Sequence, residues 1–111
     1  MKVLVLQEMA KLGTVKIRQV YDVYFRIEDN DRNNPKPDHV HLKQDGHDIA
    51  TFWLTKEGKF VIKRGKDSRV KLKEPVERVA KELEKQGFAE LVKSKALELR
   101  GEPIFYENYN I

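Results

Sequence analysis

The stretch HVHLKQDGHDIATFWL, residues 39–54, constrains the fold of this chain more than any other part of it. It reads as a strand, the pair Asp45-Gly46, and a second strand. Asp-Gly is the strongest short signal for a β-hairpin, because a type I′ turn requires positive φ at both central residues. The sequence therefore predicts a tight antiparallel hairpin in the middle of the chain.

The hairpin also predicts which side chains share a face of the sheet, because side chains alternate along a strand. With Asp45 and Gly46 as turn residues, Gln44 faces His47, and the register that follows pairs His39 with Phe52. A slip of one residue would reverse the assignment. One face is expected to carry His39, His41, Lys43, Asp48, Ala50, Phe52 and Leu54. The other is expected to carry Val40, Leu42, Gln44, His47, Ile49, Thr51 and Trp53, which would place Trp53 in the core.

Further strands are predicted on both sides of the hairpin. Residues 17–27 show the clearest alternation, with Tyr21, Val23, Phe25 and Ile27 on one face, as in a half-buried antiparallel strand. Residues 2–7 read as a short strand that ends in a turn at Gly13. Three other segments are read as a polar surface loop (28–38), a strand (59–64) and a short edge strand (69–72).

The C-terminal part is predicted to be helical. Pro75 suits the first position of a helix, and Gly87 suits its end. A second helix is predicted over residues 88–100. The expected apolar stripes are Val76, Val79, Ala80 and Leu83 in the first helix, and Phe88, Leu91, Val92 and Leu99 in the second.

These elements predict one α+β domain over residues 1–111. An antiparallel sheet of four to five strands would have two C-terminal helices packed on one face. Residues 1–73 would be mainly strands, 74–100 the two helices, and 101–111 an aromatic, asparagine-rich tail.

Charge is unevenly distributed along the chain. The net charge is +4, but the segment from Lys56 to Lys73 holds eight basic and two acidic residues and alone carries +6. Such a concentration indicates a polyanionic partner, which is expected to be RNA or another polyanion. The predicted phosphate-binding residues are Lys59, Lys63, Arg64, Lys66, Arg69 and Lys71.

Several classes of protein are excluded by composition. The chain contains no cysteine, which rules out disulfide frameworks, thiolate zinc sites and cysteine catalysis. Its longest apolar run, Val3 to Leu6, is too short for a membrane span or the core of a signal peptide. A cytoplasmic protein without membrane contact is therefore expected.

His39 and His41 are the main candidates for chemistry, because two imidazoles two residues apart on a strand can converge on one atom. With an ordinary pKa of about 6.5, they suit acid–base cleavage of RNA at its 2′-hydroxyl, with Lys43 or a residue of the basic segment stabilising the phosphorane charge. With Asp48 they form a weaker candidate site for a divalent metal, and no other cofactor is predicted. They can also contact a phosphate or a partner protein, or simply be structural residues on a strand.

The same residues resemble a known family. The run KPDHVHL, followed by DIATFWL, is similar to the hallmark of a small bacterial family, domain of unknown function 4160. That family carries a Pro-Pro-His-Val-His-like motif, and some members lie beside a second small protein, as in a toxin–antitoxin pair. The resemblance spans about residues 20–62, with Asp38 in place of the second proline. It implies a mobile-element or stress-module protein, in its narrower form a toxin that acts on RNA, with His39 and His41 at the positions of the family's histidines.

Two functions from different classes are therefore predicted. The first is a small nucleic-acid-directed protein, in its most specific form a metal-independent ribonuclease. The second is a non-catalytic module, antitoxin-like, phage-borne or inhibitory, that binds a small cognate protein or forms a homodimer. For the second function, deletion of residues 103–111 is expected to abolish binding and leave the fold intact.

Overall fold

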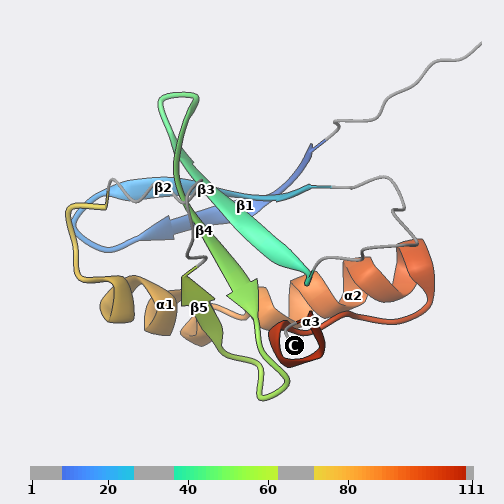
Figure 1. Cartoon of the computed structure of the whole chain (residues 1–111). Coiled ribbons are helices and arrows are strands. Elements are labelled where there is room, and N and C mark those ends of the chain that lie inside the picture. The colour runs from blue at the N-terminus through green and yellow to red at the C-terminus, as the bar shows by residue number, and fades with distance from the viewer. Residues whose placement is uncertain (1–8, 27–36, 63–71, 110–111) are drawn as a thin grey trace, which may run out of the picture.

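The computed structural model describes residues 9–26, 37–62 and 72–109. Its five strands are β1 (Met9–Lys16), β2 (Val20–Arg26), β3 (His39–Gln44), β4 (His47–Leu54) and β5 (Phe60–Ile62). They form one antiparallel sheet in chain order (Figure 1). The helices α1 (Val76–Lys85) and α2 (Phe88–Arg100) and the single turn α3 (Tyr106–Tyr109) follow it. The predicted α+β class is confirmed.

The core lies between the sheet and the two longer helices, which run along the same side of it (Figure 1). α1 contributes Val79, Ala80 and Leu83, which belong to its predicted stripe. α2 contributes Phe88, Ala89, Val92 and Ala96, while the predicted Leu91 and Leu99 are exposed. The prediction for α2 was thus partly wrong, because the helix packs through a face rich in small alanines and turns its larger leucines outward.

A β-bulge in β4 changes the predicted register of the central hairpin. Asp45 and Gly46 have φ of 53° and 80°, which confirms the turn, and Gln44 and Lys43 pair with His47 and Asp48 as expected. The pairing then shifts, so that Leu42 lies opposite Ala50 and Ile49 is the extra residue. Both Ile49 and Ala50 are buried. Because of the bulge, the side chain of Ile49 lies on the core side, and every side chain of β4 after it lies on the face opposite to the predicted one.

The predicted faces were therefore wrong for β4 beyond the bulge. Ala50, Phe52 and Leu54 lie on the core face with Val40 and Leu42. Thr51 and Trp53 lie on the opposite face, opposite His41 and His39 respectively. Trp53 is half-buried and is not part of the core.

Three other predictions need correction. Gly13 does not end a strand: it lies within β1 at a register shift, and a Cβ there would come within 3.4 Å of the Phe88 ring. Pro75 precedes α1, with an extended ψ of 140°, and is not its first helical residue. Pro37 and Asp38 are buried, although they were assigned to a surface loop. The rest of that loop, the strand predicted at 2–7 and most of that at 69–72 lie outside the described residues.

None of the described helices is long and apolar enough to cross a membrane.

Glu74 ties the segment before α1 to the turn between β1 and β2. Its buried carboxylate accepts hydrogen bonds from the backbone N–H groups of Arg18 and Gln19, at 3.2 and 3.1 Å, and from the hydroxyl of Tyr21. Burial, followed by the contact with Glu74, raises the pKa of Tyr21 to about 12. The hydrogen bond from Tyr21, followed by the two backbone donors, outweighs burial and lowers the pKa of Glu74.

We expect Glu74→Gln to reduce the free energy of unfolding at neutral pH by about 1–3 kcal/mol. Because the folded-state pKa of Glu74 lies below its ordinary value of 4.5, the carboxylate stabilises the fold above that pH, and the stabilisation is lost as pH falls through the folded-state pKa. Urea unfolding of both proteins from about pH 7 to about pH 3 checks this. A difference that stayed constant with pH would contradict it.

Candidate functional site

The face of the sheet opposite α1 and α2, called the outer face below, carries most of the residues singled out in the sequence. Cross-strand pairing arranges them in three rows. The rows are His39–Trp53–Val61, Lys11–Tyr24–His41–Thr51 and Thr14–Asp22–Lys43–Asp48. The sheet thus brings His39, His41 and Lys43 together with Tyr24 from β2 and Thr51 and Trp53 from β4.

The two histidine rings lie edge to face, with centroids 4.9 Å apart. His39 is buried, and its Nδ1 lies 2.8 Å from the carbonyl oxygen of Pro37, which fixes the ring. His41 is half-buried, with Nδ1 3.4 Å from the hydroxyl of Thr51, and its Nε2 is buried. Backbone and hydroxyl partners at Nδ1 are what orient a catalytic imidazole. The burial of both rings, however, places the pair against the sheet and not in open solvent.

The charged groups of the outer face are largely paired with each other. Lys11 and Asp22 form an ion pair at 3.1 Å, and Lys43 and Asp48 form a longer one at 3.9 Å. The ammonium group of Lys43 also lies 5.5 Å from the centroid of the Tyr24 ring, in cation–π range. The outer face therefore combines aromatic rings with cations, and its own charges nearly cancel.

The remaining predicted residues lie elsewhere or outside the described residues. His47 is exposed at the hairpin turn, on the side opposite the histidine pair, as predicted. Lys59 is exposed in the turn between β4 and β5, 3.8 Å from Glu57. Lys63, Arg64, Lys66, Arg69 and Lys71 lie outside the described residues.

The candidate metal ligands do not form a cluster. Within residues 9–26, 37–62 and 72–109, no three histidine, aspartate or glutamate side chains are grouped as metal ligands would be. Asp48 lies two rows from His39, at the turn end of the hairpin, where it faces Lys43.

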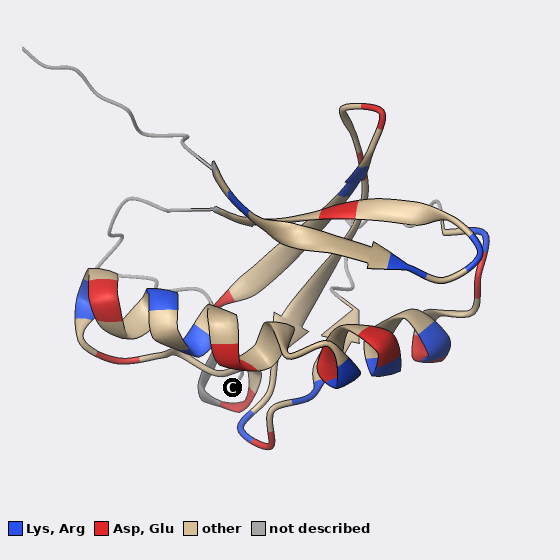
Figure 2. Cartoon of the chain, turned by 180° about the vertical axis from the view of Figure 1, so that it is seen from behind, with Lys and Arg blue, Asp and Glu red and all other residues tan. Residues whose placement is uncertain are grey.

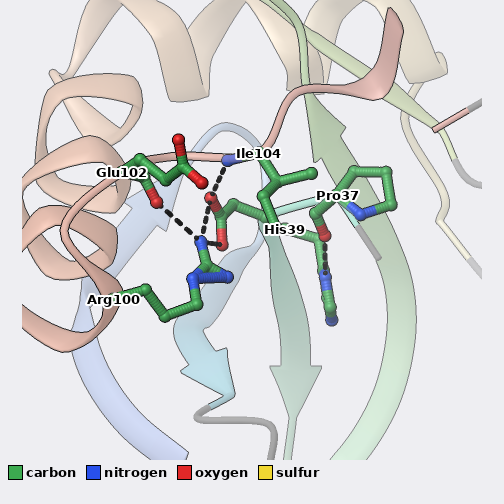
Figure 3. A network of polar contacts seen from close by, with 6 residues as sticks. Pro37, His39, Arg100, Glu102 and Ile104 are labelled. Atoms are coloured by element: carbon green, nitrogen blue, oxygen red, sulfur yellow. Dashed lines mark hydrogen bonds and ion pairs between the residues drawn. The ribbon is translucent and has the colours of Figure 1, made fainter. Parts of the chain in front are cut away.

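Asp38, predicted from the sequence to lie in a loop, is the centre of a polar network next to His39 (Figure 3). Both of its carboxylate oxygens accept from Nη2 of Arg100, at 2.6 and 2.7 Å, and one also accepts from the N–H of Ile104 at 2.7 Å. Its own N–H donates to the carbonyl of Ile104, and its carbonyl accepts from the N–H of Leu54. Asp38 thus joins β3, β4, the end of α2 and the tail.

Through this network the tail belongs to the fold. Beyond Ile104, the ring of Tyr106 lies edge to face against Trp53, with centroids 5.7 Å apart, and Glu107 accepts from the N–H of Lys56 at 2.9 Å. Deletion of residues 103–111 would remove these contacts and the partner of a buried carboxylate. The expectation that such a deletion leaves the fold intact therefore no longer holds.

Burial dominates the electrostatics of Asp38. It raises the pKa of this carboxyl above the ordinary value of 3.8, against the lowering by the N–H of Ile104 and by Arg100. Because the folded-state pKa of Asp38 lies above its ordinary value, this carboxyl contributes most to the free energy of unfolding when it is protonated. That contribution to stability is lost as pH rises through the folded-state pKa. Its direction is opposite to that of Glu74.

We expect Asp38→Ala to lower the free energy of unfolding by about 2–4 kcal/mol, because it leaves the N–H of Ile104 and the guanidinium of Arg100 without their acceptor. Asp48→Ala is the matched control: it removes a half-exposed carboxylate from a long ion pair and should cost less than about 0.5 kcal/mol. Chemical denaturation at neutral pH measures both. Equal losses in the two variants would show that the network does not hold the tail.

The chain matches no family model, no curated protein and no solved structure. The resemblance to domain of unknown function 4160 stays a prediction.

Proposed function

We propose that this protein binds single-stranded RNA across the outer face of its sheet. The observation that carries the proposal is the middle row, where Tyr24 lies between Lys11 and His41 with the ammonium group of Lys43 against its ring. Rings for stacking on bases, next to cations for the backbone, are the common elements of single-strand recognition on a sheet.

Long-range attraction would come from outside this face, because Lys11 and Lys43 are paired with aspartates. The segment from Lys56 to Lys73 carries +6, and its three described basic side chains, Lys56, Lys59 and Lys73, are all exposed. We therefore assign attraction of RNA to this segment and contact with bases to Tyr24 and its neighbours.

Cleavage by His39 and His41 is a narrower proposal that rests on RNA binding. The Nδ1 contacts of both rings favour it, because a partner at Nδ1 fixes the orientation and the tautomer of an imidazole. Because His39 and Nε2 of His41 are buried, the two rings must become accessible when RNA binds before they can exchange protons with it. A toxin-type role is the form of this proposal that the family resemblance implies.

We expect Tyr24→Ala to weaken RNA binding by about fivefold to a hundredfold, because stacking on an aromatic ring contributes about 1–3 kcal/mol per base. Tyr24→Phe keeps the ring and should bind like the unchanged protein. Fluorescence anisotropy of a labelled single-stranded RNA, at about 50 mM and about 200 mM KCl, measures affinity and its salt dependence. The single tryptophan, Trp53, lies on the same face and gives an independent fluorescence signal.

Absence of RNA binding by the folded, unchanged protein would contradict the proposal. It would favour the second predicted function, a module that binds another protein.

If the histidines cleave RNA, we expect His41→Gln to abolish cleavage while binding persists, and a chelator to have no effect. His47→Gln is the matched control, because His47 is exposed on the other side of the hairpin. Gel analysis of labelled RNA with and without chelator checks this. Cleavage that survives His41→Gln would contradict acid–base catalysis by the pair, and cleavage lost with chelator would indicate a metal.

A further inference from the structure

The turn between β1 and β2 brings together basic residues that are far apart in the sequence. Lys16 and Arg18 lie at this turn, and Lys73 lies at the end of the basic segment, more than fifty positions away. All three side chains are exposed. Figure 2 shows basic residues, in blue, at the right-hand end of the view, where the β1–β2 turn lies against the chain that enters α1.

Glu74 holds these two parts of the chain together. One of its carboxylate oxygens accepts from the N–H groups of Arg18 and Gln19, and the other accepts from the hydroxyl of Tyr21. The carboxylate is buried and accepts from three donors, whereas the side chains of Lys16, Arg18 and Lys73 are exposed to solvent.

The same turn is continuous with the outer face. Lys16 pairs with Val20 two residues beyond the Thr14–Asp22 pair, and therefore on the same face of the sheet. Lys43 in turn lies opposite Asp22 and against Tyr24. A strand of RNA that stacks on Tyr24 therefore has Lys43 as its next cation, and the β1–β2 turn lies beyond it at the same end of the sheet.

We infer that Lys16, Arg18 and Lys73, here called the turn patch, bind the phosphodiester backbone of the RNA that crosses the outer face. The inference rests on the proposed function. It specifies where the RNA backbone is bound as it passes beyond the edge of the outer face. Arg18 and Lys16 lie outside the basic segment identified in the sequence, and the contacts of Glu74 bring the turn that carries them next to its end. Because the turn patch contacts phosphates and not bases, its contribution to RNA affinity should not depend on the base sequence.

The experiment compares two double variants with the same loss of charge. Lys16→Gln/Arg18→Gln removes two cations of the turn patch. Lys85→Gln/Lys95→Gln removes two from α1 and α2; Lys85 is at the last turn of α1, about 15 Å along that helix from its start. Anisotropy titrations with a single-stranded oligouridine over a series of KCl concentrations give the affinity and the slope of log K against log salt for each protein.

For the turn-patch variant we expect affinity to fall by about threefold to tenfold per cation at low salt, and the slope to decrease by about 0.7 for each lost phosphate contact. The control variant should keep the slope of the unchanged protein. An equal loss in both double variants, or no change in the slope of the turn-patch variant, would overturn the inference.

A second ligand separates phosphate contacts from base contacts. With an oligomer of the same length that has abasic sugars, Lys16→Gln/Arg18→Gln should still weaken binding, while Tyr24→Ala should have no further effect. A turn-patch effect seen only with the base-bearing RNA would overturn the inference. If the unchanged protein binds oligouridine but the patch variants behave as the control does, the proposed function stands and only the turn patch fails. If the unchanged protein binds neither ligand, both fail.

Discussion

The position of one extra residue, Ile49, determines how the whole sheet is arranged. Without the bulge, β4 would turn Thr51 and Trp53 toward the helices and leave Phe52 and Leu54 on the outer face. With it, Phe52 and Leu54 are fully buried, and Ile49 also stays on the core side. The burial of these large side chains favours the shifted register. As a consequence, Thr51 meets His41, and Trp53 meets His39 and Tyr106.

Two buried carboxylates connect distant parts of the chain to this sheet. Asp38 joins the end of α2 and the tail to β3, and Glu74 joins the entry of α1 to the β1–β2 turn. Asp38 accepts from one backbone N–H and the guanidinium of Arg100, and Glu74 accepts from two backbone N–H groups and the hydroxyl of Tyr21. These bonds offset the cost of removing each carboxylate from water. Their pKa values shift in opposite directions, because burial is the largest influence at Asp38 and hydrogen bonding is at Glu74. The two anchors hold opposite ends of the sheet.

The proposed RNA surface follows from this arrangement. The outer face supplies rings and locally paired charges, and it borders the turn patch, whose cations face solvent. In the proposed function, the rings of the outer face contact the bases, and the cations of the turn patch attract the phosphate backbone. This arrangement also gives His39 a structural position, because its ring is fixed beside Asp38, at the residue where the tail joins β3.

Local patterns in the sequence determined the elements: the Asp-Gly turn, the alternation in β2, and the bounds of α2 at Phe88 and Arg100. These depend on neighbours in the chain, so the sequence expresses them directly. The tertiary structure decided the faces of β4, the burial of Asp38 and the contact between Arg18 and Glu74. A bulge relieves a conflict between packing on both halves of a strand, and a buried carboxylate needs donors that lie more than fifty residues away. Neither is visible until the sheet and the helices come together.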